Sequence, residues 1–132
     1  MRTKLAIAAA GLGLLLASVP AIAHHSFAAE FDAAKPIKLT GSVTKVEWMN
    51  PHTYFYIDVK DEKGTVTNWG LEMGSPNGLM RQGWTRNSMK IGDVVTVEGS
   101  AAKDGSNIGN ARSVTLSGGQ RLFAGSSQTT NP

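Results

Sequence analysis

The chain has 132 residues, of which 41% are hydrophobic, 13 are basic and 10 are acidic. That length allows one small domain with a modest core. There is no cysteine, which excludes disulfides, thiol nucleophiles, zinc ribbons and lipid attachment at a cysteine.

Residues 1–23 have the features of a secretory signal peptide. Arg2 and Lys4 precede an apolar stretch, and Ala21-Ile22-Ala23 supplies the small residues that a signal peptidase requires. The apolar stretch is too short to span a membrane well. We therefore predict cleavage at Ala23-His24, a periplasmic or secreted protein, and no membrane anchor afterwards. Removal of Arg2 and Lys4 leaves nearly balanced charges, so the composition predicts no nucleic-acid partner.

The mature chain is expected to begin with an N-terminal arm at 24–35, to continue as one domain at 36–124, and to end in a flexible tail at 125–132. In the arm, Phe27 and Phe31 are four residues apart. This spacing suits either a helical turn or an arm that packs both rings onto the domain.

Alternating apolar and polar residues predict the first strand from Ile37, with a bulge at Lys45-Val46 before Trp48. Asn50-Pro51 predicts a turn. The remaining elements follow in chain order: strands at 53–59 and 65–73, separated by a hairpin turn at 61–64; a short helix at 75–82, capped by Ser75-Pro76 and ended by Gly83; strands at 94–98 and 111–116; and a short sixth strand near 120–123.

Three strands, a short helix and two strands are the element order of the OB-fold. The sequence therefore predicts a mainly β protein, a small five- to six-stranded OB-like barrel with its helix between the third and fourth strands. A small β-sandwich is the alternative, and the position of the single helix favours the barrel.

Three motifs carry a resemblance to a family. They are HHSF at 24–27, VEWMNPH at 46–52 and EMGSP at 72–76. Together they resemble an exported bacterial domain-of-unknown-function family whose members open with HHSF after the signal peptide. The resemblance implies export and a small β fold, and it implies no activity.

The mature chain has three histidines, and these are the candidate metal ligands: His24, His25 and His52. A new N-terminus at His24 would join an α-amine and an imidazole in one chelate. Nitrogen donors of this kind suit Cu(II), and imidazole also binds zinc or nickel. Glu72, Met49 and Met73 are further candidate ligands. The alternatives are a solvated N-terminal pair and a His52 that only hydrogen-bonds its turn.

The candidate ligand-binding residues are aromatic: Trp48, Tyr54, Tyr56 and Trp69. If Asp61 and Gly64 lie opposite each other, Tyr56 faces Trp69, and these rings share the outer face of the barrel near Trp48. Phe55, Ile57, Val59 and Val66 then face the interior. OB barrels bind ligands on the face of strands two and three. The alternative is that the N-terminal arm covers the rings.

The sequence lacks the nucleophile-elbow, zincin and phosphate-loop motifs, so an enzyme is the less favoured class. The leading hypothesis is a periplasmic, non-enzymatic binding protein that binds copper or a similar transition metal through its N-terminal histidine. The alternative is a module that binds a peptide, a protein or a saccharide through the aromatic face. A third hypothesis is a redox or hydrolytic enzyme built on the same histidine.

Overall fold

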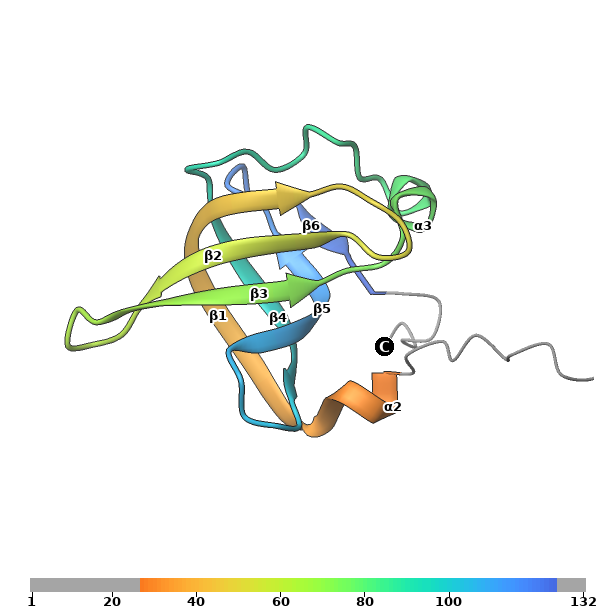
Figure 1. Ribbon diagram of the computed structural model, residues 1–132. Coiled ribbons are helices and arrows are strands. Elements are labelled where there is room, and N and C mark those ends of the chain that lie inside the picture. Colours follow the sequence, from red (N-terminus) through yellow and green to blue (C-terminus); the bar gives the residue numbers. More distant parts are fainter. Residues whose placement is uncertain (1–26, 126–132) are drawn as a thin grey trace, which may run out of the picture.

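The computed structural model describes residues 27–125 and contains two short helices and six strands (Figure 1). In chain order these are α2 (Phe27–Glu30), β1 (Phe31–Glu47), β2 (Tyr54–Lys60), β3 (Val66–Glu72), α3 (Pro76–Arg81), β4 (Val94–Ala102), β5 (Ile108–Thr115) and β6 (Arg121–Phe123). The protein is therefore mainly β, as the alternating sequence pattern predicts. No helix within residues 27–125 is long and apolar enough to cross a membrane.

The strands form one sheet that closes on itself. Its order is β3-β2-β1-β4-β5-β6, and a further pairing joins β3 to β5. The long strand β1 pairs with β2 along one part and with β4 along the other, and Figure 1 shows it curving around the sheet. Closure is a short parallel pairing that runs from Gly70 opposite Ile108 to Glu72 opposite Asn110. This topology is that of an OB-like barrel.

The hydrophobic core lies inside this closed sheet. Successive side chains of a strand point to opposite faces, so alternate residues of each strand face inward. Fully buried side chains come from every long strand and from α3, including Val43, Phe55, Leu71, Leu79 and Val97. With no cysteine in the chain, this packing holds the domain without disulfides.

The helix α3 closes one end of the barrel, between β3 and β4, where the sequence predicts it. Ser75 is its N-cap and accepts a hydrogen bond from the amide of Gly78 at 3.2 Å, and Pro76 occupies the first turn. Trp84 follows the helix, is 2% exposed, and donates from Nε1 to the carbonyl of Phe123 at 2.9 Å. Trp84 is therefore part of the hydrophobic core beside α3.

The first strand begins earlier than the sequence pattern suggests. The helical turn, one of the two expected arrangements, is formed by Phe27–Glu30, and the ring centroids of Phe27 and Phe31 lie 5.8 Å apart. The strand then starts at Phe31 rather than at Ile37, because Phe31 and Asp32 already pair with the end of β4. Its bulge lies between Val43 and Lys45, next to the expected position. The end of the predicted arm, residues 31–35, is therefore part of the sheet.

Candidate functional site

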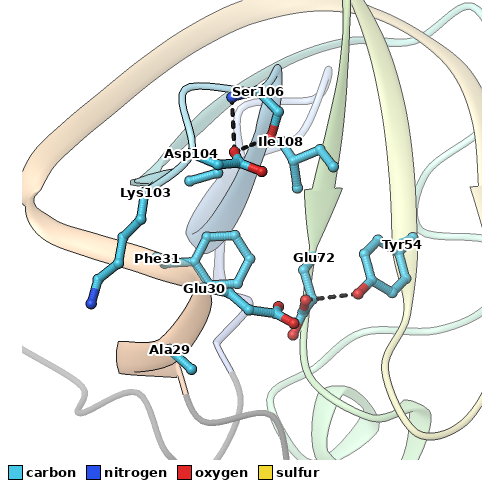
Figure 2. A pocket seen from close by; sticks show the side chains of 10 residues that line it. Ala29, Glu30, Phe31, Tyr54, Glu72, Lys103, Asp104, Ser106 and Ile108 are labelled. Atoms are coloured by element: carbon cyan, nitrogen blue, oxygen red, sulfur yellow. Dashed lines mark hydrogen bonds between the residues drawn. The ribbon is translucent and has the colours of Figure 1, made fainter.

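The main candidate site is a cavity on the outer face of β2 and β3, with a volume of about 420 Å³ (Figure 2). Three parts of the chain form it: the helix α2 with the start of β1, the facing strands β2 and β3, and the loop between β4 and β5. Its lining residues are Ala29, Glu30, Phe31, Tyr54, Glu72, Ala102, Lys103, Asp104, Ser106 and Ile108. Strands two and three together with the β4–β5 loop form the ligand-binding face of OB-folds.

Glu72 is the central polar residue of this face. It ends β3 directly opposite Tyr54, and it is only 6% exposed. Tyr54 donates its hydroxyl hydrogen to Oε2 of Glu72 at 2.7 Å, and Nδ1 of His52 lies 2.9 Å from Oε1. Each carboxylate oxygen therefore has a polar neighbour, as is usual for a buried polar side chain.

The environment of Tyr54 keeps its hydroxyl protonated. Burial, the hydrogen bond to Glu72 and the nearby charges of Glu72 and Glu30 together raise the pKa of Tyr54 well above its ordinary value, with burial as the largest cause. A tyrosinate at this position would lose hydration and would face two carboxylates. Tyr54 consequently acts as a stable hydrogen-bond donor to Glu72 over the physiological pH range.

The opposite wall of the cavity is built by pairing within the sheet and by one turn. Phe31 is 3% exposed and lies opposite Ala102 in the β1–β4 ladder. The amide of Lys103 donates to the carbonyl of Glu30 at 2.9 Å, which ties the β4–β5 loop to α2. In that loop the amide of Ser106 donates to Oδ1 of Asp104 at 2.9 Å, and its hydroxyl donates to the same oxygen at 2.6 Å. These bonds lower the pKa of Asp104 and keep it ionised.

The predicted register of the β2–β3 hairpin is wrong by one residue. The expected pairs place Tyr56 opposite Trp69, whereas Tyr56 lies opposite Gly70 and Trp69 lies opposite Ile57. The cause is the turn, in which the Asp61 amide donates to the Thr65 carbonyl at 2.9 Å, so three residues rather than two separate the paired strands. Gly64 supplies the positive φ of 84° that such a three-residue loop requires.

A one-residue slip moves every side chain of a strand to the other face. Tyr54 and Tyr56 therefore lie on the outer face, as expected, while Trp69 shares the inward face with Ile57 and packs against the core together with Trp48. Val66, expected inside, is 52% exposed. The prediction of one contiguous surface formed by all four rings is thus corrected.

Tyr56 has its own set of polar neighbours away from Glu72. Its hydroxyl donates to Oε2 of Glu47 at 3.5 Å, and Nζ of Lys45 lies 5.5 Å from its ring centroid. Lys45 also forms an ion pair with Glu47, and this contact raises the pKa of Lys45. The Tyr56 ring therefore already has a cation–π contact with Lys45 of the same sheet.

The candidate metal ligands are only partly within the described residues. His24 and His25 lie outside residues 27–125, whereas His52 precedes β2 and contacts Glu72. Among the further candidates, Met73 is 1% exposed inside the core and Met49 is exposed in the β1–β2 loop. Within residues 27–125, no group of three or more histidine, cysteine, aspartate or glutamate side chains is arranged to hold a metal ion. Residues 27–125 alone therefore lack such a donor set.

The sequence pattern indicates Glu72 only as an additional metal ligand and contains no sign of the cavity. Four of the missed lining residues are Glu30, Phe31, Asp104 and Ile108. The hairpin sequence Asp61-Glu62-Lys63-Gly64-Thr65 was an available signal, because a glycine that ends such a turn favours a three-residue loop. With that register, Tyr54 and Glu72 would have been placed opposite each other. The contact of α2 with the β4–β5 loop had no sequence signal.

The chain matches a family profile, and a solved structure is partly similar to it. The profile of a family described as "Family of unknown function (DUF6152)" matches residues 11–112, which is more than three quarters of the chain. No curated protein matches the chain. A similar solved structure is that of the mitochondrial single-stranded DNA binding protein Rim1 of S. cerevisiae, with 12% sequence identity, a TM-score of 0.49, and coverage of 62% of this chain and 92% of that chain. Likeness at this level says nothing about which ligand this chain binds.

Proposed function

The chain belongs to the DUF6152 family, to which no function is assigned, and we propose from its site that it is an exported, non-enzymatic protein that binds Cu(II) or a similar transition metal. The proposed ligands are His52 and the N-terminal His24, with His25 as a further donor. The contact of His52 with Glu72 is the observation that carries this proposal.

That contact prepares His52 as a ligand. A carboxylate has no proton to donate, so the 2.9 Å contact favours the tautomer in which Nδ1 of His52 carries the hydrogen. In the neutral ring, the lone pair is then on Nε2, which is the atom that a metal would bind. Histidine ligands commonly donate their other ring hydrogen to a carboxylate in this way, which fixes the tautomer and the ring orientation.

Glu72 is itself held in place. Its second oxygen accepts the hydroxyl of Tyr54 at 2.7 Å, and its side chain is 8% exposed. A histidine that merely completed its turn would not need a buried carboxylate and a half-buried tyrosine behind it. The chain Tyr54–Glu72–His52 instead resembles the supporting residues of a metal ligand.

The missing donors are available close by in sequence. His25 is two residues before Phe27, where α2 begins, and α2 lines the same cavity as Tyr54 and Glu72. Each residue of chain spans at most roughly 3.6 Å, so the tether between α2 and the two histidines is short. The signal peptide at 1–23 remains our prediction, and the proposal requires it because cleavage creates the amine at His24.

The test is a Cu(II) titration of the exported protein, followed by electron paramagnetic resonance. We expect one Cu(II) with nitrogen ligands. His52→Ala and an alanine inserted before His24 should each change the spectrum and weaken binding. Glu72→Gln should weaken binding about 10- to 100-fold, the usual effect of removing a supporting carboxylate.

Glu47→Gln is the matched control, because Glu47 also accepts a tyrosine hydroxyl on the outer face but does not contact His52. It should leave the affinity unchanged. An unaltered spectrum and affinity in His52→Ala would remove His52 from the site. The same result for the extended N-terminus would remove the chelate at His24.

The alternative of a peptide-, protein- or saccharide-binding module depended on one aromatic surface. With Trp48 and Trp69 packed against the core, that surface is reduced to Tyr54 and Tyr56. No contact within residues 27–125 favours this alternative over metal binding.

A further inference from the structure

We propose that the cavity on the outer face of β2 and β3 binds a small organic amine, with a positively charged ammonium group on a short apolar stem. This ligand differs from the proposed metal ion. His52 does not line the cavity, and Glu72 lies between the two positions because it faces the cavity and also contacts His52.

The shape of the cavity suits a small molecule. Its volume of about 420 Å³ lies in the range of small-molecule sites, roughly 300–1,000 Å³. It is formed by three segments that are distant in sequence, and two of them are linked by the bond from the Lys103 amide to the Glu30 carbonyl. These two walls are therefore joined to each other before any ligand arrives.

The charges of the cavity favour a cation. Three carboxylates line it, from Glu30, Glu72 and Asp104, against the single ammonium of Lys103. Figure 2 shows Glu72 joined to Tyr54 at one side of the cavity and Asp104 with Ser106 at the other. The hydroxyls of Tyr54 and Ser106 already donate to carboxylates, so the lining offers many acceptors and few donors. A ligand with N–H donors and a positive charge complements it.

The apolar part of the lining favours a ligand whose ammonium group is attached to an apolar stem. Phe31, Ala29 and Ala102 contribute buried or small apolar surface, and Ile108 is 45% exposed at the rim. An inorganic cation would leave this surface without a partner. An amine on a ring or a short alkyl stem would cover it, and the Phe31 and Tyr54 rings also attract cations.

The test uses metal-free exported protein and three matched probes in isothermal titration calorimetry: 2-phenylethylammonium, the neutral 2-phenylethanol and the anionic 3-phenylpropionate. We expect the amine to bind, the alcohol to bind at least tenfold more weakly and the anion not at all. Binding of the amine should weaken as salt is added, because its charge is screened. Absence of amine binding at millimolar concentration, or equal binding of the alcohol, would overturn the proposal.

Two pairs of variants locate the site. Asp104→Asn keeps an acceptor for Ser106 and removes only the charge, and we expect about a tenfold loss of amine affinity. Its control is Asp61→Asn, which changes a similar turn away from the cavity. There Oδ1 of Asp61 accepts hydrogen bonds from the amides of Lys63 and Thr65, each at 2.9 Å. Ile108→Ala should weaken binding, and Ile91→Ala, at a residue 74% exposed and outside the cavity, should not. Equal losses in a variant and its control would overturn the assignment.

The outcome is separable from that of the metal proposal. His52→Ala should abolish or alter copper binding while it leaves the amine affinity within about twofold. Asp104→Asn should weaken amine binding and leave copper binding unchanged. A protein that binds copper but no amine disproves only the cavity proposal, and the opposite result disproves only the metal site.

Discussion

Replacement of Tyr54 by phenylalanine tests whether Glu72 depends on the hydroxyl that it accepts. The substitution keeps the ring and removes one donor, 2.7 Å from Oε2 of a carboxylate that is 6% exposed. A hydrogen bond to a charged group contributes roughly 1.5–3 kcal/mol, and a buried acceptor that loses its partner adds a desolvation cost. We expect Tyr54→Phe to lower the free energy of unfolding by about 2 kcal/mol at pH 7.

The same substitution changes the response to alkaline pH. The folded protein raises the pKa of Tyr54, mainly through burial and then through Glu72. Because the pKa of Tyr54 is higher in the folded state, the stability that its protonated hydroxyl contributes is fully present below the unfolded-state pKa of about 10. This stability is lost as the pH rises toward the folded-state pKa. The stability of the unmutated protein should therefore fall above pH 10 more steeply than that of Tyr54→Phe.

Urea unfolding followed by tryptophan fluorescence, at pH 7 and between pH 10 and 11.5, measures both effects. Tyr56→Phe is the control, because its hydroxyl lies 3.5 Å from Glu47, at the limit of a hydrogen bond, on the same face of the same strand. It should cost less than about 0.5 kcal/mol. If both variants lose the same stability, or show the same slope above pH 10, the reasoning about Glu72 is refuted.

Two further predictions concern the sheet. Gly99→Ala should lower the free energy of unfolding, measured with heat or urea, by roughly 3 kcal/mol, because a Cβ at this bulge of β4 would overlap the carbonyl oxygen of Asn110 in β5. The control is Gly118→Ala, where no atom lies within 4 Å of the added Cβ, and it should be nearly neutral. Equal losses of stability would contradict the close approach of β4 and β5. Arg121→Gln should raise the pKa of Glu98, because the hydrogen bond from Arg121 holds this pKa below its ordinary value. The stability that the Glu98 carboxylate contributes is present above its unfolded-state pKa and is lost as the pH falls through its folded-state pKa. A carbon-detected NMR titration of Glu98 measures the change, and identical curves for both proteins would contradict the assigned cause.

The succession of strands and helix along the chain could be predicted from the sequence because the signals of these elements are local. Alternation from Ile37 onward marks a half-buried strand, and Ser75-Pro76 followed by Gly83 marks the beginning and the end of α3. Even the bulge of β1 is visible as a break in the alternation near Lys45. Each of these features depends on residues within one or two turns of chain, so no knowledge of distant contacts is needed.

The hairpin register lies at the limit of what the sequence determines. The turn at 61–64 is evident, but the number of residues in the loop decides which face each ring occupies. A bond between the Asp61 amide and the Thr65 carbonyl, rather than a closure at Gly64, places Trp69 inside and leaves Tyr54 opposite Glu72. Because the observed register differs from the expected one by one residue, the four rings do not share one surface, and Tyr54 lies opposite Glu72.

The sequence by itself determined a small mainly β chain with one capped helix and three histidines. Only the tertiary structure decided that Phe31 joins β4, that β3 meets β5 in parallel, and that the β4–β5 loop rests on α2. These contacts join residues 38 to 73 positions apart. Closing such loops depends on the packing of the whole barrel rather than on local propensity. For that reason the cavity, which exists only where those segments meet, had no signature in the sequence.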